Sequence, residues 1–176
     1  MKIEYTELLL YFVPALLVLV TAFFLIKKFL DDSYKLKLLE VRKASQKDIL
    51  PLRLQAYERL CLFLERITPV NMIPRVHQSG MTAKQLQSQL LTTVRTEFEH
   101  NLSQQLYVSS AAWEAVKNAK EDVVKLVNSA VVSTTDNASA LDLSKAIFSI
   151  VIRNETSPTQ KAIDFLKQET RSILGA

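Results

Sequence analysis

The sequence predicts an all-α protein in which an N-terminal transmembrane helix precedes a compact cytosolic bundle of about five helices. Three observations lead to this prediction: one long uncharged apolar run, apolar residues at three- and four-residue spacing afterwards, and only two glycines. Glycine averages about 7% of residues in proteins, and both strand-rich folds and phosphate-binding loops need it at turns. The single cysteine excludes an internal disulfide, so the domain must be stabilised by its apolar core.

The first predicted element is a membrane-spanning helix over residues 8–29, after a short extracytoplasmic N-terminus of residues 1–7. Leu8 to Ile26 is a run of 19 uncharged residues, and such a helix spans about 28 Å, close to the roughly 30 Å thickness of the hydrocarbon layer. The run is apolar all round, which does not fit the core helix of a soluble protein. A cleaved signal peptide is the alternative, but the preceding segment holds two acids against one lysine and the run continues past the possible cleavage site.

A basic connector helix is predicted next, over residues 30–50. One lysine precedes the anchor, whereas residues 27–47 carry seven Lys and Arg, so the positive-inside rule places the following domain in the cytoplasm. Positive charge beside the bilayer is attracted to anionic lipid headgroups, although these residues could also serve only to fix the topology. The candidate headgroup contacts are Lys27, Lys28, Lys35 and Lys37.

The helical domain is predicted over residues 51–176. Pro51 suits the first turn of a new helix, and apolar residues on one face extend this helix to Ile67. Capping boxes predict two further helix starts, Ser139 with Asp142 predicts a third, and two serines predict a fourth before a polar loop at residues 133–137. The predicted starts are Thr82, Ser109–Ser110, Ser139 and Ser157, and Gly175 is the predicted C-cap of the last helix.

Residues 68–81 are predicted to be the longest irregular loop of the domain, because they hold two prolines, an asparagine and a glycine. Loops carry function more often than the helices that support them, and prolines reduce the entropy lost when a partner orders such a segment. The alternative is that Met72 and Ile73 fill the core beneath the helix ends. The candidate partner-binding residues of this loop are Val70, Met72, Ile73, Arg75, Val76 and His77.

The search for catalytic chemistry yields one weak pattern. Glu97 and His100 have the E-x-x-H spacing of di-iron carboxylate bundles, but those proteins need two such motifs and two further glutamates. Cys61 lies on an apolar helix face, where cysteine behaves as a small, unreactive hydrophobe. No serine elbow or glycine-rich phosphate motif is present. We therefore predict no catalytic residue, cofactor or metal ligand, and an enzyme is the less favoured hypothesis.

Several segments of the domain resemble a known family. They are Pro51 to Arg59, Phe63 to Arg66, Pro69 to Asn71, Glu97 to Ser103 and the pair Ala112–Trp113. With the leading anchor, they resemble an uncharacterised family of small single-pass membrane proteins from Bacteroidetes-type bacteria. The resemblance implies a protein of the bacterial inner membrane with a cytoplasmic domain, and it implies no activity, substrate or site.

The leading functional hypothesis is a membrane-anchored, non-enzymatic helical interaction protein, such as an accessory subunit of a membrane complex. Its expected partners are the lipid bilayer and another membrane or cytosolic protein. Nucleic acid is not expected, since residues 78–176 carry ten basic and ten acidic side chains. Two alternatives stay open: a metal-dependent, di-iron-like enzyme using Glu97 and His100, and a peripheral-stalk-like structural tether, although four prolines after the anchor interrupt the continuous helix that a stalk requires.

Overall fold

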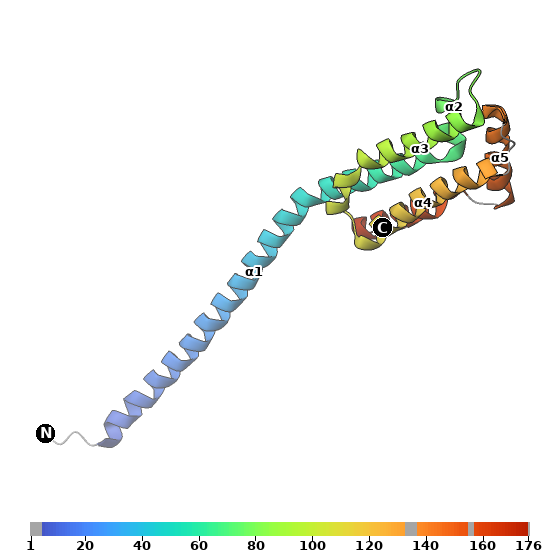
Figure 1. Cartoon of the computed structure of the whole chain (residues 1–176). Helices are drawn as coiled ribbons and strands as arrows, with labels where there is room; N and C mark the ends of the chain where they lie inside the picture. The colour runs from blue at the N-terminus through green and yellow to red at the C-terminus, as the bar shows by residue number, and fades with distance from the viewer. Residues whose placement is uncertain (1–4, 133–136, 155–156, 176) are drawn as a thin grey trace. The chain divides into compact units, whose positions relative to one another are not determined.

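A computed structural model describes residues 5–132, 137–154 and 157–175 of the chain (Figure 1). Every regular element in these described ranges is a helix, which confirms the predicted all-α class. Contacts divide the chain into two compact units, Met1–Ile49 and Leu50–Ala176. The division lies next to Pro51, where the sequence predicted that the helical domain begins. The predicted polar loop at 133–137 lies outside the described residues except for Asn137.

Helix α1 runs from Tyr5 to Ile67 and contributes to both units. The prediction of a fresh helix start at Pro51 was wrong, because the helix continues through this residue. A proline inside a helix removes one backbone hydrogen bond and costs roughly 3 kcal/mol. Pro51 is exposed, so water can reach the carbonyl that loses its donor. The predicted end of this helix at Ile67 is confirmed.

The first unit presents its apolar side chains outward. All residues from 11 to 32 are exposed, and the stretch Tyr11–Val41 is long and apolar enough to cross a membrane by length and composition. No part of its most apolar segment is buried. Thr21 adds a local polar contact, since its hydroxyl donates to the carbonyl of Leu17 at 2.9 Å. This unit therefore has no core of its own in the described residues.

The second unit is a helical bundle around one hydrophobic core. The C-terminal part of α1 enters it, and α3 packs against α4 and α5 while α4 also contacts α6 (Figure 1). Its fully buried large side chains come from every long helix except α4, whose buried residues are valines, alanines and Leu126. After α1 the elements are α2 (Pro69–Val76), α3 (Ala83–Glu99), the 3₁₀ helix η1 (Leu102–Leu106), α4 (Ser110–Val132), α5 (Ala140–Arg153) and α6 (Gln160–Leu174).

Two of the predicted helix starts are true capping boxes. The Thr82 hydroxyl accepts from the Gln85 amide, and the Gln85 side chain accepts from the Thr82 amide; Ser139 and Asp142 pair in the same way. An isolated antiparallel bridge joins Thr82 to Ser139, so α3 and α5 begin side by side. The capping box predicted at Ser157 was wrong: α6 starts at Gln160, after an N-cap at Thr159 that makes no side-chain cap bond. Gly175 adopts φ +75 as the C-cap, as predicted.

A buried hydroxyl contact joins the end of α1 to the start of α6. The side-chain oxygens of Thr68 and Thr159 lie 2.6 Å apart, and the Thr68 hydroxyl also bonds the Leu64 carbonyl. Ser157 extends this group, with its hydroxyl 3.0 Å from that of Thr159. Polar groups buried in a core cost free energy unless they are hydrogen-bonded, and here they bond each other.

Candidate functional site

The segment expected to be an irregular loop is mostly helical. Pro69–Val76 form α2, with Pro69 in the first turn and Pro74 inside the helix. Pro69 costs nothing there, because the first amides of a helix have no partner within it. Pro74 removes one hydrogen bond from a short helix, and burial of the apolar face outweighs that loss. The prediction of a loop failed because it treated both prolines as breakers.

The candidate partner-binding residues do not share one surface. Met72 and Ile73 are buried, with exposed fractions of 0% and 4%, and both belong to the hydrophobic core. Val76 is half-buried against that core, whereas Val70, Arg75 and His77 are exposed. The alternative given by the sequence, a hydrophobic plug beneath the helix ends, therefore describes Met72 and Ile73 correctly.

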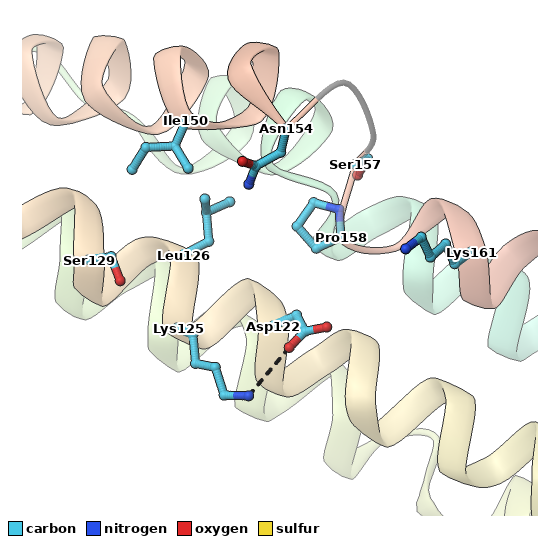
Figure 2. A pocket seen from close by; sticks show the side chains of 9 residues that line it. All are labelled: Asp122, Lys125, Leu126, Ser129, Ile150, Asn154, Ser157, Pro158 and Lys161. Carbon is cyan, nitrogen blue, oxygen red and sulfur yellow. Dashed lines mark hydrogen bonds and ion pairs between the residues drawn. The ribbon is translucent and has the colours of Figure 1, made fainter.

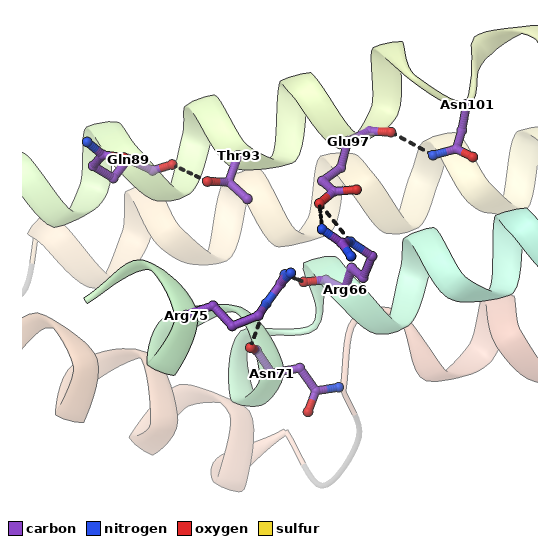
Figure 3. Close-up of polar contacts among 7 residues, drawn as sticks. All are labelled: Arg66, Asn71, Arg75, Gln89, Thr93, Glu97 and Asn101. Atoms are coloured by element: carbon purple, nitrogen blue, oxygen red, sulfur yellow. Dashed lines mark hydrogen bonds and ion pairs between the residues drawn. The ribbon is translucent and has the colours of Figure 1, made fainter. Parts of the chain in front are cut away.

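Polar side chains hold the turn between α1 and α2 (Figure 3). Arg75 donates to the carbonyl of Arg66 at 2.6 Å and to that of Asn71 at 3.2 Å. Asn71 donates to the carbonyl of Glu65 at 3.0 Å. The last carbonyls of a helix lack partners within it, and here side chains of α2 supply the donors. The exposed Arg75 thus stabilises the turn between α1 and α2, which the sequence did not indicate.

The Glu97–His100 pair does not converge on a metal position. Nε of Arg66 donates to Oε1 of Glu97 at 2.7 Å, so the carboxylate is already engaged by a cation (Figure 3). His100 is exposed at the C-cap of α3. In the described parts of the chain, no three His, Cys, Asp or Glu side chains form a group that could hold a metal ion. A di-iron site requires several such carboxylates around the metals.

Cys61 is half-buried on α1 and packs against the core. Burial raises the pKa of its thiol, because the thiolate loses hydration; nearby Lys167 opposes this and Glu65 adds to it. A raised pKa keeps the group in the thiol form at neutral pH, and the thiolate is the nucleophile. The environment of Cys61 therefore favours the role of a small hydrophobe that the sequence predicted.

The four candidate headgroup contacts lie in the first unit. Lys27, Lys28, Lys35 and Lys37 are all exposed on α1. They follow the apolar run within about three helical turns, which corresponds to roughly 15 Å along a helix axis. A bilayer that surrounds the apolar run would thus have these ammonium groups near its surface.

A feature that the sequence did not indicate is a cavity of about 530 Å³ between α4, the end of α5 and the start of α6 (Figure 2). Its walls come from three separate stretches of the chain. In Figure 2, Leu126 points from α4 toward Ile150 of α5 and Asn154 at the C-cap of that helix. The lining residues are Asp122, Lys125, Leu126, Ser129, Ile150, Asn154, Ser157, Pro158 and Lys161.

The cavity combines an apolar floor with a positive rim. Leu126 is buried, and Ile150 and Pro158 are half-buried. Lys125 pairs with Asp122 of its own helix at 3.4 Å, and both side chains are mostly exposed. Lys161 has no ion-pair partner among the described residues. The described lining residues thus carry two positive charges and one negative charge.

Sequence reasoning missed this cavity because its residues occupy ordinary positions. The polar residues from α4 lie on its outward face, where a sequence pattern indicates a solvated surface. The residues from α5 and α6 come from the ends of two helices and the link between them. Only the packing of three helices brings these groups together, and no spacing in the sequence records it.

Comparison with known proteins identifies a family. The model of DUF7935, a family of unknown function, matches residues 3–173 of the chain. No curated protein and no solved structure matches this chain.

Proposed function

We propose that this chain, which belongs to the DUF7935 family, is a single-pass membrane protein whose bundle is a non-enzymatic interaction module. In this proposal α1 anchors the bundle at a bacterial inner membrane, and the bundle serves in the cytoplasm as an accessory subunit of a membrane complex. The family assignment covers the anchor and the bundle together, so the two units are treated as one functional protein.

The observation that carries the proposal is the uncovered apolar surface of α1. Leu19 is 66% exposed and Phe24 is 63% exposed, in a stretch where every described residue is exposed. Soluble proteins rarely leave contiguous apolar patches larger than a few hundred Å² in water. A bilayer removes this cost, since Leu, Ile, Phe and Val each favour the membrane by about 0.3–0.6 kcal/mol at the centre of a helix.

The charge pattern supports a cytoplasmic bundle. The basic residues follow the apolar run, and cytoplasmic flanks of membrane helices are enriched in Lys and Arg. Lys27, Lys28, Lys35 and Lys37 would contact anionic headgroups there, each contributing about 1 kcal/mol. The balanced charge of residues 78–176 gives the rest of the bundle no such attraction.

The interaction role is supported by how the polar residues of the bundle are used. Glu97 bonds Arg66, Arg75 bonds backbone carbonyls, and Glu169 accepts from the Ser109 hydroxyl at 3.0 Å. These groups stabilise the fold and do not converge on a reacting position. A partner protein could use Val70 and Arg75 on the exposed part of α2 together with His77, its C-cap.

Two experiments test the proposal. Protease added to intact spheroplasts should leave the bundle uncut and should digest it after lysis; cleavage in intact spheroplasts would reverse the proposed topology. Gentle detergent extraction should recover a stoichiometric partner protein with the full chain. Recovery of the monomer alone, or a stoichiometric amount of iron, manganese or zinc in the purified protein, would contradict the accessory-subunit role.

A further inference from the structure

We propose that the cavity between α4, α5 and α6 binds a small amphipathic anion, a carboxylate or phosphate monoester with a short apolar group. The anionic group would lie between Lys125 and Lys161, and the apolar group would lie on Leu126, Ile150 and Pro158. This inference is independent of the membrane anchor and of any partner protein. It concerns a site within the second unit alone.

The size of the cavity sets the size of the ligand. Its volume of about 530 Å³ falls inside the range of roughly 300–1,000 Å³ that is usual for small-molecule sites. Such sites usually have a mostly apolar lining, whereas six of the nine lining residues here are polar or charged, so the ligand should be strongly polar at one end. Here the apolar floor is continuous with the bundle core, because Leu126 is a core residue and Ile150 packs against that core.

The charges of the lining favour an anion over a cation or a neutral ligand. Lysines from α4 and α6 face the same cavity, and they are separated by 36 positions in the sequence. The single acid, Asp122, is 3.4 Å from Lys125, which is a long contact between exposed groups. Lys161 lacks an ion-pair partner among the described residues, so its ammonium group is available to a ligand.

A hydroxyl group at the rim would complete the binding of an anionic group. The hydroxyl of Ser129 on α4 makes no hydrogen bond with another described side chain or backbone group, so it can donate to a ligand. Ser157 lies on the opposite wall, but its hydroxyl donates to that of Thr159, which in turn donates to Thr68, so Ser157 has no proton left for the anion. Hydrogen bonds from charged donors to phosphate or carboxylate oxygens are roughly twice as strong as neutral ones. The two lysines should therefore account for most of the affinity.

The test uses the full chain in nanodiscs of phosphatidylcholine, with hexyl phosphate as the probe and calorimetry as the readout. We expect hexyl phosphate to bind more tightly than inorganic phosphate and more tightly than hexanol. Lys125→Gln and Lys161→Gln should each weaken binding by about tenfold, since each removes a charge-assisted contact. Lys117→Gln is the matched control: Lys117 pairs with Glu114 three residues away on the same helix, as Lys125 does with Asp122, but lies outside the cavity.

A second readout needs no mutation. Bound hexyl phosphate should slow the acylation of Lys125 and Lys161 in the wild-type protein, and it should leave the acylation of Lys117 unchanged. Nanodiscs that contain phosphatidic acid identify the source of the anion: competition with hexyl phosphate assigns the site to a lipid headgroup, and no competition assigns it to a soluble anion. Equal binding in all variants, equal binding of hexanol, or no binding of hexyl phosphate would overturn the proposal.

Discussion

Leucine side chains are exposed in the N-terminal part of helix α1, whereas those on the core face of its C-terminal part are buried. Leu17 and Leu19, near the N-terminal end, are 61% and 66% exposed, whereas Leu60 and Leu64, near the C-terminal end, are fully buried. In the first unit the apolar residues surround the helix, and in the second they lie on one face with charged residues opposite. Only the second pattern tells which side of the helix a protein core covers. The first is the pattern typical of a helix that crosses a bilayer.

The largest effect should come from charge in the apolar run. Leu17→Arg combined with Val18→Arg should abolish membrane association, since each arginine costs about 2.5–3.5 kcal/mol at the centre of a membrane helix. Flotation of membranes on a density gradient measures the bound fraction. Leu62→Arg, at a position in the bundle that is 58% exposed, is the control and should leave the fraction unchanged. Full membrane association of the double variant would remove the basis for the anchor.

The next effect concerns α2, which has one buried and one exposed face. Met72→Ala should destabilise the bundle by about 2–5 kcal/mol, because it leaves a cavity in the core. Val70→Ala, at a residue that is 52% exposed, should stay within about 0.5 kcal/mol of wild type. Chemical denaturation of the full chain in detergent, followed by circular dichroism, compares the two. Equal unfolding midpoints would mean that Met72 lies on a surface and could serve a partner.

A smaller effect is expected at the hydroxyl contact between α1 and α6. Thr68→Val should cost about 1–2 kcal/mol, since it removes one partner of a buried hydrogen bond while keeping the side-chain shape. Thr92→Val, at an exposed position of α3, should be nearly neutral. The same denaturation experiment applies. A neutral Thr68→Val variant would show that Ser157 alone satisfies Thr159 in the core.

The smallest effect involves the capping box of α5 and depends on pH. Hydrogen bonds from Ser139 hold the pKa of Asp142 below its ordinary value, so this contact stabilises the fold at neutral pH and is lost as pH falls through the lowered pKa. Ser139→Ala should cost about 1 kcal/mol at pH 7. It should also flatten the fall in stability below about pH 4, where free aspartate titrates. An unchanged acid limb of the stability curve would disprove the coupling.

Local chemistry decided which parts of the fold could be predicted. The capping boxes at Thr82 and Ser139 need only residues three apart, and both are present. The end of α1 at Ile67 and the cap at Gly175 also depend on local preferences. The failures involve prolines: α1 continues through Pro51, and α2 contains Pro74. A sequence shows that a proline removes a hydrogen bond from a helix. It does not show whether water reaches the freed carbonyl, as at Pro51, or whether burial of the helix compensates for the loss, as at Pro74.

The candidate site was less predictable than the fold. The segment 68–81 was singled out as a binding loop for its apolar residues, and two of them are core residues. Apolar composition alone cannot distinguish a binding surface from a core plug, because both bury the same side chains. The cavity depends on three helices meeting, and its lysines look like any solvated pair in the sequence. Only the tertiary structure shows that these lysines line one cavity.

The contact between Thr68 and Thr159 also bears on when the bundle can close during synthesis. It joins residues 91 positions apart, and α6 lies near the end of the chain. The core face of Leu50–Ile67 leaves the ribosome before α6 has been made. Synthesis proceeds at about 5–20 residues per second, so this face waits several seconds for its last partner helix. Closure of the bundle therefore has to wait until α6 has left the ribosome.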